Sequence, residues 1–186
     1  MLSSPPTILP KDVIPSEKEI VRLIGGAKKE IRAQVLDYST QHRDRSPYDT
    51  IDKALRAAAA RGVHVKLMVS HWSTEKPAID ALKEISRLPN VEVRIVTIPR
   101  AKEGAIPFAR VNHSKIMAID GKVAWVGTSN WSGGSLDKLR NLEVVVKNEK
   151  LAQRLTKLHE QLWSSQYSAK IDPGKEYPAK PDRGAD

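Results

Sequence analysis

Apolar and polar positions follow two different periods in turn along the first hundred residues. Apolar residues recur at every third or fourth position, as in an amphipathic helix, in residues 17–30, 51–61 and 77–88. Each of these segments is followed by a run typical of a strand, in residues 31–38, 63–69 and 91–98. Because a parallel strand pair needs a long crossover connection, this order predicts βαβ units in an α/β layer architecture.

The second half of the chain predicts a hairpin, a further strand and a long helix. Residues 115–119 and 122–127 have strand patterns on either side of an Asp-Gly pair, which is a strong two-residue turn signal. Residues 142–146 predict one more strand, and residues 149–163 predict a helix whose leucine stripe packs on the core. We therefore expect an α/β fold with a mixed, mostly parallel β-sheet and helices on both faces.

Local signals indicate where elements begin and end. Ser16 and Glu19 fit a capping box at the start of the first helix, and Gly62 stands where a helix C-cap belongs. The chain is expected to divide into an N-terminal extension, one folded domain and a loosely held, flexible tail, at residues 1–15, 16–167 and 168–186.

Charge and cysteine content narrow the function. The 186 residues include 31 Lys and Arg against 22 Asp and Glu, a formal net charge of +9. Such an excess favours a polyanionic partner, either nucleic acid or an anionic lipid surface. The absence of cysteine excludes a disulfide scaffold, a thiol nucleophile and a thiolate metal site. No apolar run approaches the roughly 18 residues of a membrane span and no signal-peptide pattern is visible, so the default expectation is a cytoplasmic protein.

Candidate chemistry gathers in residues 112–130, which read NHSKIMAIDGKVAWVGTSN. His113 and Lys115 are two positions apart, so on a strand they share a face and present an imidazole and an ammonium to one ligand. Asn130 follows the partner strand of the hairpin and can bring an amide to the same end. A cation and an amide can bind non-bridging oxygens while the imidazole attacks phosphorus, so this set suits a phosphate ester.

The whole pattern H-x-K-x4-D-x6-G-[GST]-x-N, which runs from His113 to Asn130, resembles the phospholipase D superfamily. The downstream triplet that ends at Glu143 matches the N-x-E usually found in that family. Three stretches also resemble the C-terminal half of the lysosomal phospholipase-D-like exonucleases and their bacterial and viral relatives: AQVLDYS, IDKALRAAAARGVHVKLMVSHW and PFARVNHSKIMAIDGKVAWVGTSNWSG.

The resemblance implies a mechanism and a role for each motif residue. Family enzymes use two facing motifs: one histidine attacks phosphorus and forms a phosphohistidine, the other protonates the leaving oxygen, and no metal or organic cofactor is required. The resemblance makes His113 the nucleophile or its acid partner, with Lys115 and Asn130 clamping the phosphate. Glu143 is expected to hydrogen-bond and orient the imidazole. Asp120 belongs to the motif but is interpreted as structural, because it begins the turn away from the reacting atoms.

Other residues near the motif are candidate substrate contacts. Thr128 and Ser129 offer hydroxyl groups, and Arg110 can meet a flanking phosphate. Trp72 and Trp131 each follow a predicted strand end, where they either stack on bases or are buried indoles. Arg140 also flanks the motif and can meet a flanking phosphate, and Arg100 and Lys102 lie in a loop that can form a groove edge; the alternative for these basic residues is plain surface charge. No metal-ligand spacing links the remaining histidines, which are interpreted as surface or loop residues: His42, His64, His71 and His159.

The chain carries one motif where the mechanism needs two. One imidazole cannot be both the nucleophile and the acid on the opposite side of an in-line displacement, so we expect a C2 homodimer with two copies of His113 at its interface. Alternatively, the chain is one half of a longer two-motif enzyme and acts as a binding module. Charge and resemblance favour a nuclease that cuts single-stranded DNA or RNA. A phospholipase D or transphosphatidylase, with membrane lipid as the partner, stays open.

Overall fold

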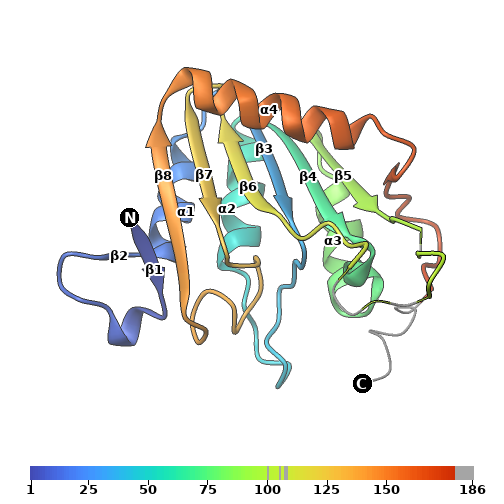
Figure 1. The fold of residues 1–186 in the computed structure, drawn as a ribbon, viewed down its shortest axis with the longest axis horizontal. Coiled ribbons are helices and arrows are strands. Elements are labelled where there is room, and N and C mark those ends of the chain that lie inside the picture. The colour runs from blue at the N-terminus through green and yellow to red at the C-terminus, as the bar shows by residue number, and fades with distance from the viewer. Residues whose placement is uncertain (100, 105, 107–108, 179–186) are drawn as a thin grey trace.

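One mixed sheet organises the molecule. The computed structural model describes residues 1–99, 101–104, 106 and 109–178. Its strands lie in the order β2-β1-β8-β7-β6-β3-β4-β5-β9 (Figure 1). In chain order the strands are β1 (Leu2–Ser4), β2 (Ile14–Pro15), β3 (Glu30–Val35), β4 (His64–Ser70), β5 (Val91–Val96), β6 (Lys115–Ile119), β7 (Val123–Gly127), β8 (Asn141–Lys147) and β9 (Ser168–Lys170).

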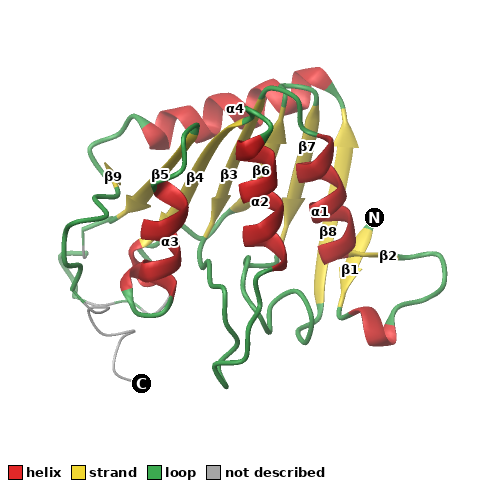
Figure 2. Cartoon of the chain, turned by 180° about the vertical axis from the view of Figure 1, so that it is seen from behind, coloured by secondary structure: helices red, strands yellow, loops and turns green. Residues whose placement is uncertain are grey.

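Helices cover both faces of the sheet, as the sequence predicts. α1 (Ser16–Gly26), α2 (Thr50–Ala60) and α3 (Ala78–Ser86) lie side by side on one face (Figure 2). α2 and α3 each join two parallel strands, and the right-handed crossover rule places both on that face. α4 (Glu149–Trp163) crosses the other face, at the end of the sheet away from the carboxyl ends of β3 and β4 (Figure 1). Two short 3-10 turns, η1 (Pro6–Ile8) and η2 (His71–Thr74), complete the described elements.

Parallel pairing is confined to β3-β4-β5 and to the β1-β2 pair. The other neighbours in the described sheet are antiparallel, so the expectation of a mostly parallel sheet is wrong. The cause is the connectivity, because β6 and β7 form a hairpin and β8 returns beside β7. The turn between β6 and β7 forms at the predicted place, with φ of 53° at Asp120 and 66° at Gly121.

The main core fills the space between the sheet and α1–α3. Ala33, Leu67 and Val93 form one row across β3, β4 and β5 and are fully buried in that core. A smaller apolar cluster lies on the other face under α4, formed by Met68, Val96 and Trp163. The two layers leave the carboxyl ends of β3 and β4 and the start of β6 at one common edge of the sheet (Figure 1).

The first helix begins and ends differently from the prediction. Ser16 is the first helical residue and makes no capping bond, and Glu19 instead pairs with Arg22. α1 ends at Gly26, before residue 30, because the consecutive glycines weaken helix propensity there. Gly62 follows α2 with a φ of 86°, which confirms the predicted C-terminal stop.

The buried face of α4 is not the leucine stripe. Ala152, His159 and Trp163 face the sheet, whereas Leu158 is half exposed. His159, interpreted from the sequence as a surface or loop histidine, is 1% exposed. The other leucines of the predicted stripe are partly buried, and Leu162 packs against the cluster under α4.

Both terminal segments contribute strands. β1 pairs with β8 within the stretch expected to be an extension. β9 pairs with β5 and is followed by the buried Ile171, so the expectation of a loose tail is wrong for residues 168–171; residues 179–186 lie outside the described residues. In the described part of the chain, no helix combines the length and apolar character that a membrane crossing requires.

Candidate active site

The motif residues meet where β6 begins and β7 ends. Lys115 pairs in register with Gly127, and Gly127 pairs with Glu143 on β8. In-register neighbours of an antiparallel sheet point to the same face, so these positions form one row. A Cβ at Gly127 would collide with Glu143 Cγ and lie 2.9 Å from Trp125. The absence of a side chain at Gly127 therefore lets the Glu143 side chain pass close to the main chain of β7, toward the site.

The imidazole and the ammonium are in contact. Lys115 Nζ lies 3.3 Å from both ring nitrogens of His113 and donates a 2.7 Å hydrogen bond to the His113 carbonyl oxygen. Lys115 is 6% exposed, whereas His113 is exposed. A buried cation on the strand thus supports an accessible imidazole on the preceding residues, which confirms that the H-x-K spacing brings the two groups together.

Asn130 is held at the same edge by the chain after β3. The Asp37 N–H donates to Asn130 Oδ1 at 3.2 Å, and the Trp131 N–H donates to the Asp37 carbonyl at 3.1 Å. Because the main chain occupies the amide oxygen, the donors of the Asn130 amide are the part left to meet an anion.

Electrostatics favour a neutral imidazole beside a charged lysine. Burial first, and then the charge of Lys115, lowers the pKa of His113, while Asp37 acts in the opposite direction. Burial also lowers the pKa of Lys115, again opposed by Asp37. Asp37 is a functional candidate that the sequence reasoning missed, although it stands in the AQVLDYS stretch directly after the buried strand. A neutral imidazole is the form that can act as a nucleophile.

Glu143 is anchored by Ser129. Glu143 is 1% exposed, and its Oε1 accepts a hydrogen bond from Ser129 Oγ. Ser129 is fully buried, so its assignment as a substrate contact is wrong: its hydroxyl holds a carboxylate. Among the described residues Glu143 Oε2 has no hydrogen-bond partner, and no bond from Glu143 to the His113 ring is formed. The expected orienting bond is therefore absent from this single chain.

The predicted aromatic contacts are buried. Trp131 is 1% exposed and packs against Trp125, with ring centroids 6.2 Å apart. Trp72 is also buried. A base needs an exposed ring face to stack on, so both assignments as stacking platforms are wrong and the alternative of a buried indole holds.

The remaining predicted contacts lie at or near the surface. Thr128 is exposed, but its hydroxyl donates to Asn141 Oδ1 at 2.8 Å and accepts from the Leu142 N–H at 3.2 Å. Three of the basic residues near the motif are exposed: Lys102, Arg110 and Arg140. Arg100 lies outside the described residues.

Asp120 lies at the opposite end of the β6-β7 hairpin from His113. Its carboxylate accepts hydrogen bonds from the N–H groups of Lys28, Lys29 and Glu30 at 2.8–2.9 Å. These bonds counter the effect of burial and lower the pKa of Asp120. The motif aspartate thus ties the hairpin turn to the start of β3 and takes no part in the site.

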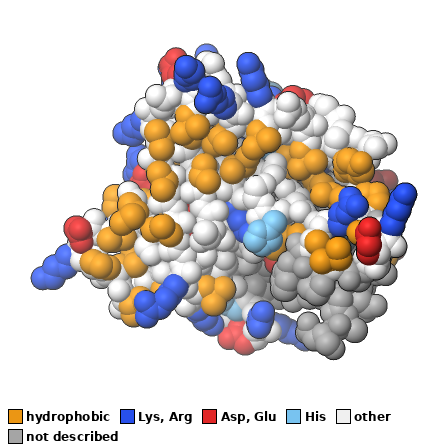
Figure 3. Space-filling view, viewed as in Figure 1, with side chains coloured by type: hydrophobic (Ala, Val, Ile, Leu, Met, Phe, Trp, Pro, Cys, Tyr) orange, Lys and Arg blue, Asp and Glu red, His pale blue; other side chains and the backbone are white. Residues whose placement is uncertain are grey.

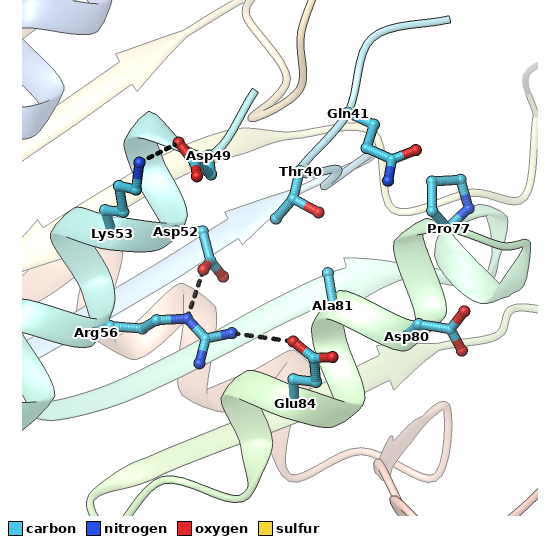
Figure 4. Close-up of a pocket in the computed structure, with 10 residues that line it drawn as sticks. All are labelled: Thr40, Gln41, Asp49, Asp52, Lys53, Arg56, Pro77, Asp80, Ala81 and Glu84. Carbon is cyan, nitrogen blue, oxygen red and sulfur yellow. Dashed lines mark hydrogen bonds and ion pairs between the residues drawn. The ribbon is translucent and has the colours of Figure 1, made fainter. Parts of the chain in front are cut away.

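A separate cleft lies between α2 and α3 (Figure 4). It has a volume of about 550 Å³ and is crossed by Arg56, which bridges Asp52 and Glu84. No residue of the motif lines it. Across the described residues, no three His, Cys, Asp or Glu side chains come together as metal ligands would.

Comparison with known proteins addresses the family. A family model described as "Cardiolipin synthase, PLD-like domain" matches residues 20–163. The chain belongs to the phospholipase D superfamily. This confirms the resemblance found from the motif, and residues 16–167 remain our estimate of the phospholipase D-like domain.

Similar sequences and folds occur among members of the superfamily. The "Probable phospholipase D F09G2.8" of Caenorhabditis elegans is 33% identical over 183 residues, covering 89% of this chain and 33% of that protein. The "5'-3' exonuclease PLD4" of Mus musculus is 33% identical over 190 residues, covering 91% and 38%. The chain thus spans 33% and 38% of the lengths of these two relatives.

Solved structures confirm the fold class. "NucT from Helicobacter pylori" superposes with a TM-score of 0.67 at 18% identity, covering 83% of this chain and 89% of that chain. Nuc from Salmonella typhimurium, titled a phospholipase D family member, gives a TM-score of 0.66 at 22% identity, covering 84% and 90%. At these identities the likeness establishes the fold alone.

Proposed function

We propose that this chain is a phosphodiesterase that hydrolyses nucleic-acid phosphodiester bonds, preferentially in single strands, with His113 as the nucleophile. The supporting observation is the contact of Lys115 Nζ with the His113 ring at 3.3 Å, at the edge of the sheet where the Asp37 N–H also holds the Asn130 side chain by its amide oxygen. An ammonium and an amide bind the non-bridging oxygens and stabilise the charge that develops on them.

The reaction runs in two displacements. A ring nitrogen of His113 attacks phosphorus, the bond from phosphorus to the leaving oxygen breaks, and that oxygen takes a proton from a second imidazole. Water then attacks the phosphohistidine, the phosphorus–nitrogen bond breaks, and the proton of the water passes to the second imidazole. The lowered pKa of His113 favours the neutral form that the attacking ring needs, whereas the same ring in the second copy must be protonated to act as the acid.

A second copy of the chain supplies the second imidazole in this scheme. One apolar strip, formed by Val126, Leu142 and Val144, is 43–51% exposed on β7 and β8. Val126 pairs with Ile116 and with Val144, so the strip lies on the face of the sheet that carries α4, opposite to the face of the row formed by Lys115, Gly127 and Glu143. Figure 3 shows apolar side chains spread over the face that carries α4. A C2 contact that includes this strip would bury exposed apolar surface, and the scheme requires that the same contact extend over the edge of the sheet where β6 begins.

The net charge of the chain and the names of its relatives favour nucleic acid as the substrate. The chain has a net charge of +9, and a protein with this balance gains affinity by releasing counterions from a polyanion. One relative is named a 5'-3' exonuclease. Another relative is named a probable phospholipase D, so a phospholipid is the alternative substrate to compare with nucleic acid.

Cleavage of end-labelled single-stranded DNA and RNA, in EDTA and across pH 5–8, tests the proposal. The wild-type chain is expected to cut, His113→Ala to be inactive, and Lys115→Ala to lose about 100- to 1,000-fold in kcat. His64→Ala, which removes an exposed imidazole on β4, is the matched control and should keep wild-type activity. Intact oligonucleotides together with choline released from phosphatidylcholine vesicles would show a phospholipase D activity and contradict the proposed nuclease.

The oligomeric state is tested separately by light scattering. A dimer is expected for the wild type, and Val144→Asp, which puts a charge into the apolar strip, is expected to give a monomer with little cleavage. A wild-type monomer that still cleaves would exclude the paired-histidine scheme.

A further inference from the structure

We propose that Gln34 is a positioning residue: it holds the chain on both sides of His113 and so sets the direction of the imidazole. This inference rests on the proposed role of His113 as the nucleophile. Gln34 lies on β3, and its side chain reaches the segment that leads into β6.

One amide group contacts both neighbours of the nucleophile. Gln34 Nε2 donates to Asn112 Oδ1 at 2.6 Å and also to Ser114 Oγ. The Ser114 hydroxyl in turn donates to Asn112 Oδ1 at 3.4 Å, which closes a three-membered network. A primary amide has two N–H donors, so this arrangement uses both. The residues before and after His113 are thereby fastened to the same point on β3.

The place of Gln34 in the sheet makes a purely structural role a poor explanation. Gln34 is 4% exposed, and its in-register neighbours are the apolar Met68 and Ile116. Its Oε1 and Asn112 Nδ2 are buried without a partner among the described residues, which disfavours folding. An apolar side chain at this position would pack between Met68 and Ile116 without an unpaired oxygen. What the amide adds is its hold on residues 112 and 114.

His113 depends on that hold because its ring has little other support. Among the described residues, the ring nitrogens of His113 contact Lys115 Nζ at 3.3 Å, while the shorter hydrogen bond of the lysine, at 2.7 Å, goes to the His113 carbonyl oxygen. The direction of the imidazole therefore follows the main chain of residues 112–114. The charged groups that act on it are Lys115 at the start of β6 and Asp37 in the segment that follows β3.

The variant Gln34→Met tests the inference, because it keeps the length of the side chain and removes both donors. Its kcat is expected to fall about ten- to a hundredfold with KM within twofold. The substrate phosphate still binds, but the displaced imidazole is poorly placed to attack it. In the substrate-free protein, an NMR titration of the His113 ring, assigned by its loss in His113→Gln, is expected to show a raised pKa. The ring would then have left the partly buried position beside Lys115.

Val65→Ala is the matched control, because it truncates a buried residue at the start of β4, the end of the sheet away from the site. It should lower stability but leave the His113 titration and kcat unchanged. A wild-type titration curve in Gln34→Met, or the same displacement in Val65→Ala, would overturn the inference. If the wild-type protein cleaves no phosphodiester, the proposed function fails, and the titration alone still decides whether Gln34 positions the ring.

Discussion

Mild acid is expected to destabilise the fold through a histidine far from the site. His159 is buried under α4 and stacks on Trp163, with ring centroids 5.2 Å apart. Burial first, and then the charge of Arg32, lowers its pKa from 6.5 to about 4; Lys66 acts in the same direction and Glu160 in the opposite one. The ring is therefore neutral in the folded protein over most of the physiological range.

The sign and size of the effect follow from this shift. Between pH 6.5 and 4 the unfolded chain binds a proton at His159 that the folded chain does not, so the free energy of unfolding falls as the pH is lowered through this window. The full loss below pH 4 is about 3 kcal/mol, and about 2 kcal/mol of it is already present at pH 5. Above pH 6.5 His159 contributes no pH dependence.

Urea unfolding at pH 7.5 and pH 5.0, followed by tryptophan fluorescence, measures this effect. His159→Phe keeps a ring next to Trp163 and removes the titration, so its stability should change between the two pH values by about 2 kcal/mol less than that of the wild type. His64→Gln, at an exposed position, is the control and should keep the wild-type difference. Equal pH dependences for wild type and His159→Phe would refute the assignment of this loss to the buried ring.

Three further predictions concern the hairpin and the site. Gly127→Ala should abolish activity and cost about 1–3 kcal/mol of stability, because its methyl group collides with Glu143 and crowds Trp125; an unchanged urea midpoint would contradict this. Asp120→Ala should cost about 1–3 kcal/mol with kcat retained, since three N–H groups lose their acceptor. Because the pKa of this carboxyl is lowered, the wild-type advantage should persist at neutral pH and disappear as the pH falls through the folded-state pKa, which acid-dependent unfolding checks. Activity should follow a bell in pH around the titration of the two imidazoles, and a rate that climbs steadily into alkali would exclude the pair.

Local patterns in the sequence were sufficient for the elements and for the centre of the site. Alternating apolar positions predict β4 and β5, apolar positions three or four residues apart predict α2, and the Asp-Gly pair predicts the hairpin, because these signals depend on neighbours within a few residues. The contact between His113 and Lys115 could be predicted for the same reason, because two residues that are two positions apart stay close together in the folded chain. Lys115 and His113 therefore lie together as predicted.

Burial and long-range partners were decided only by the tertiary structure. Trp131, Ser129 and His159 carry polar or aromatic groups that the sequence allows at the surface, yet packing encloses all three. Asp37 and Gln34 reach the site because β3 lies against β6, a pairing between segments some eighty residues apart in the chain. A single sequence records the chemistry of each side chain but not which distant strand it will face, and that register determines which groups surround the nucleophile.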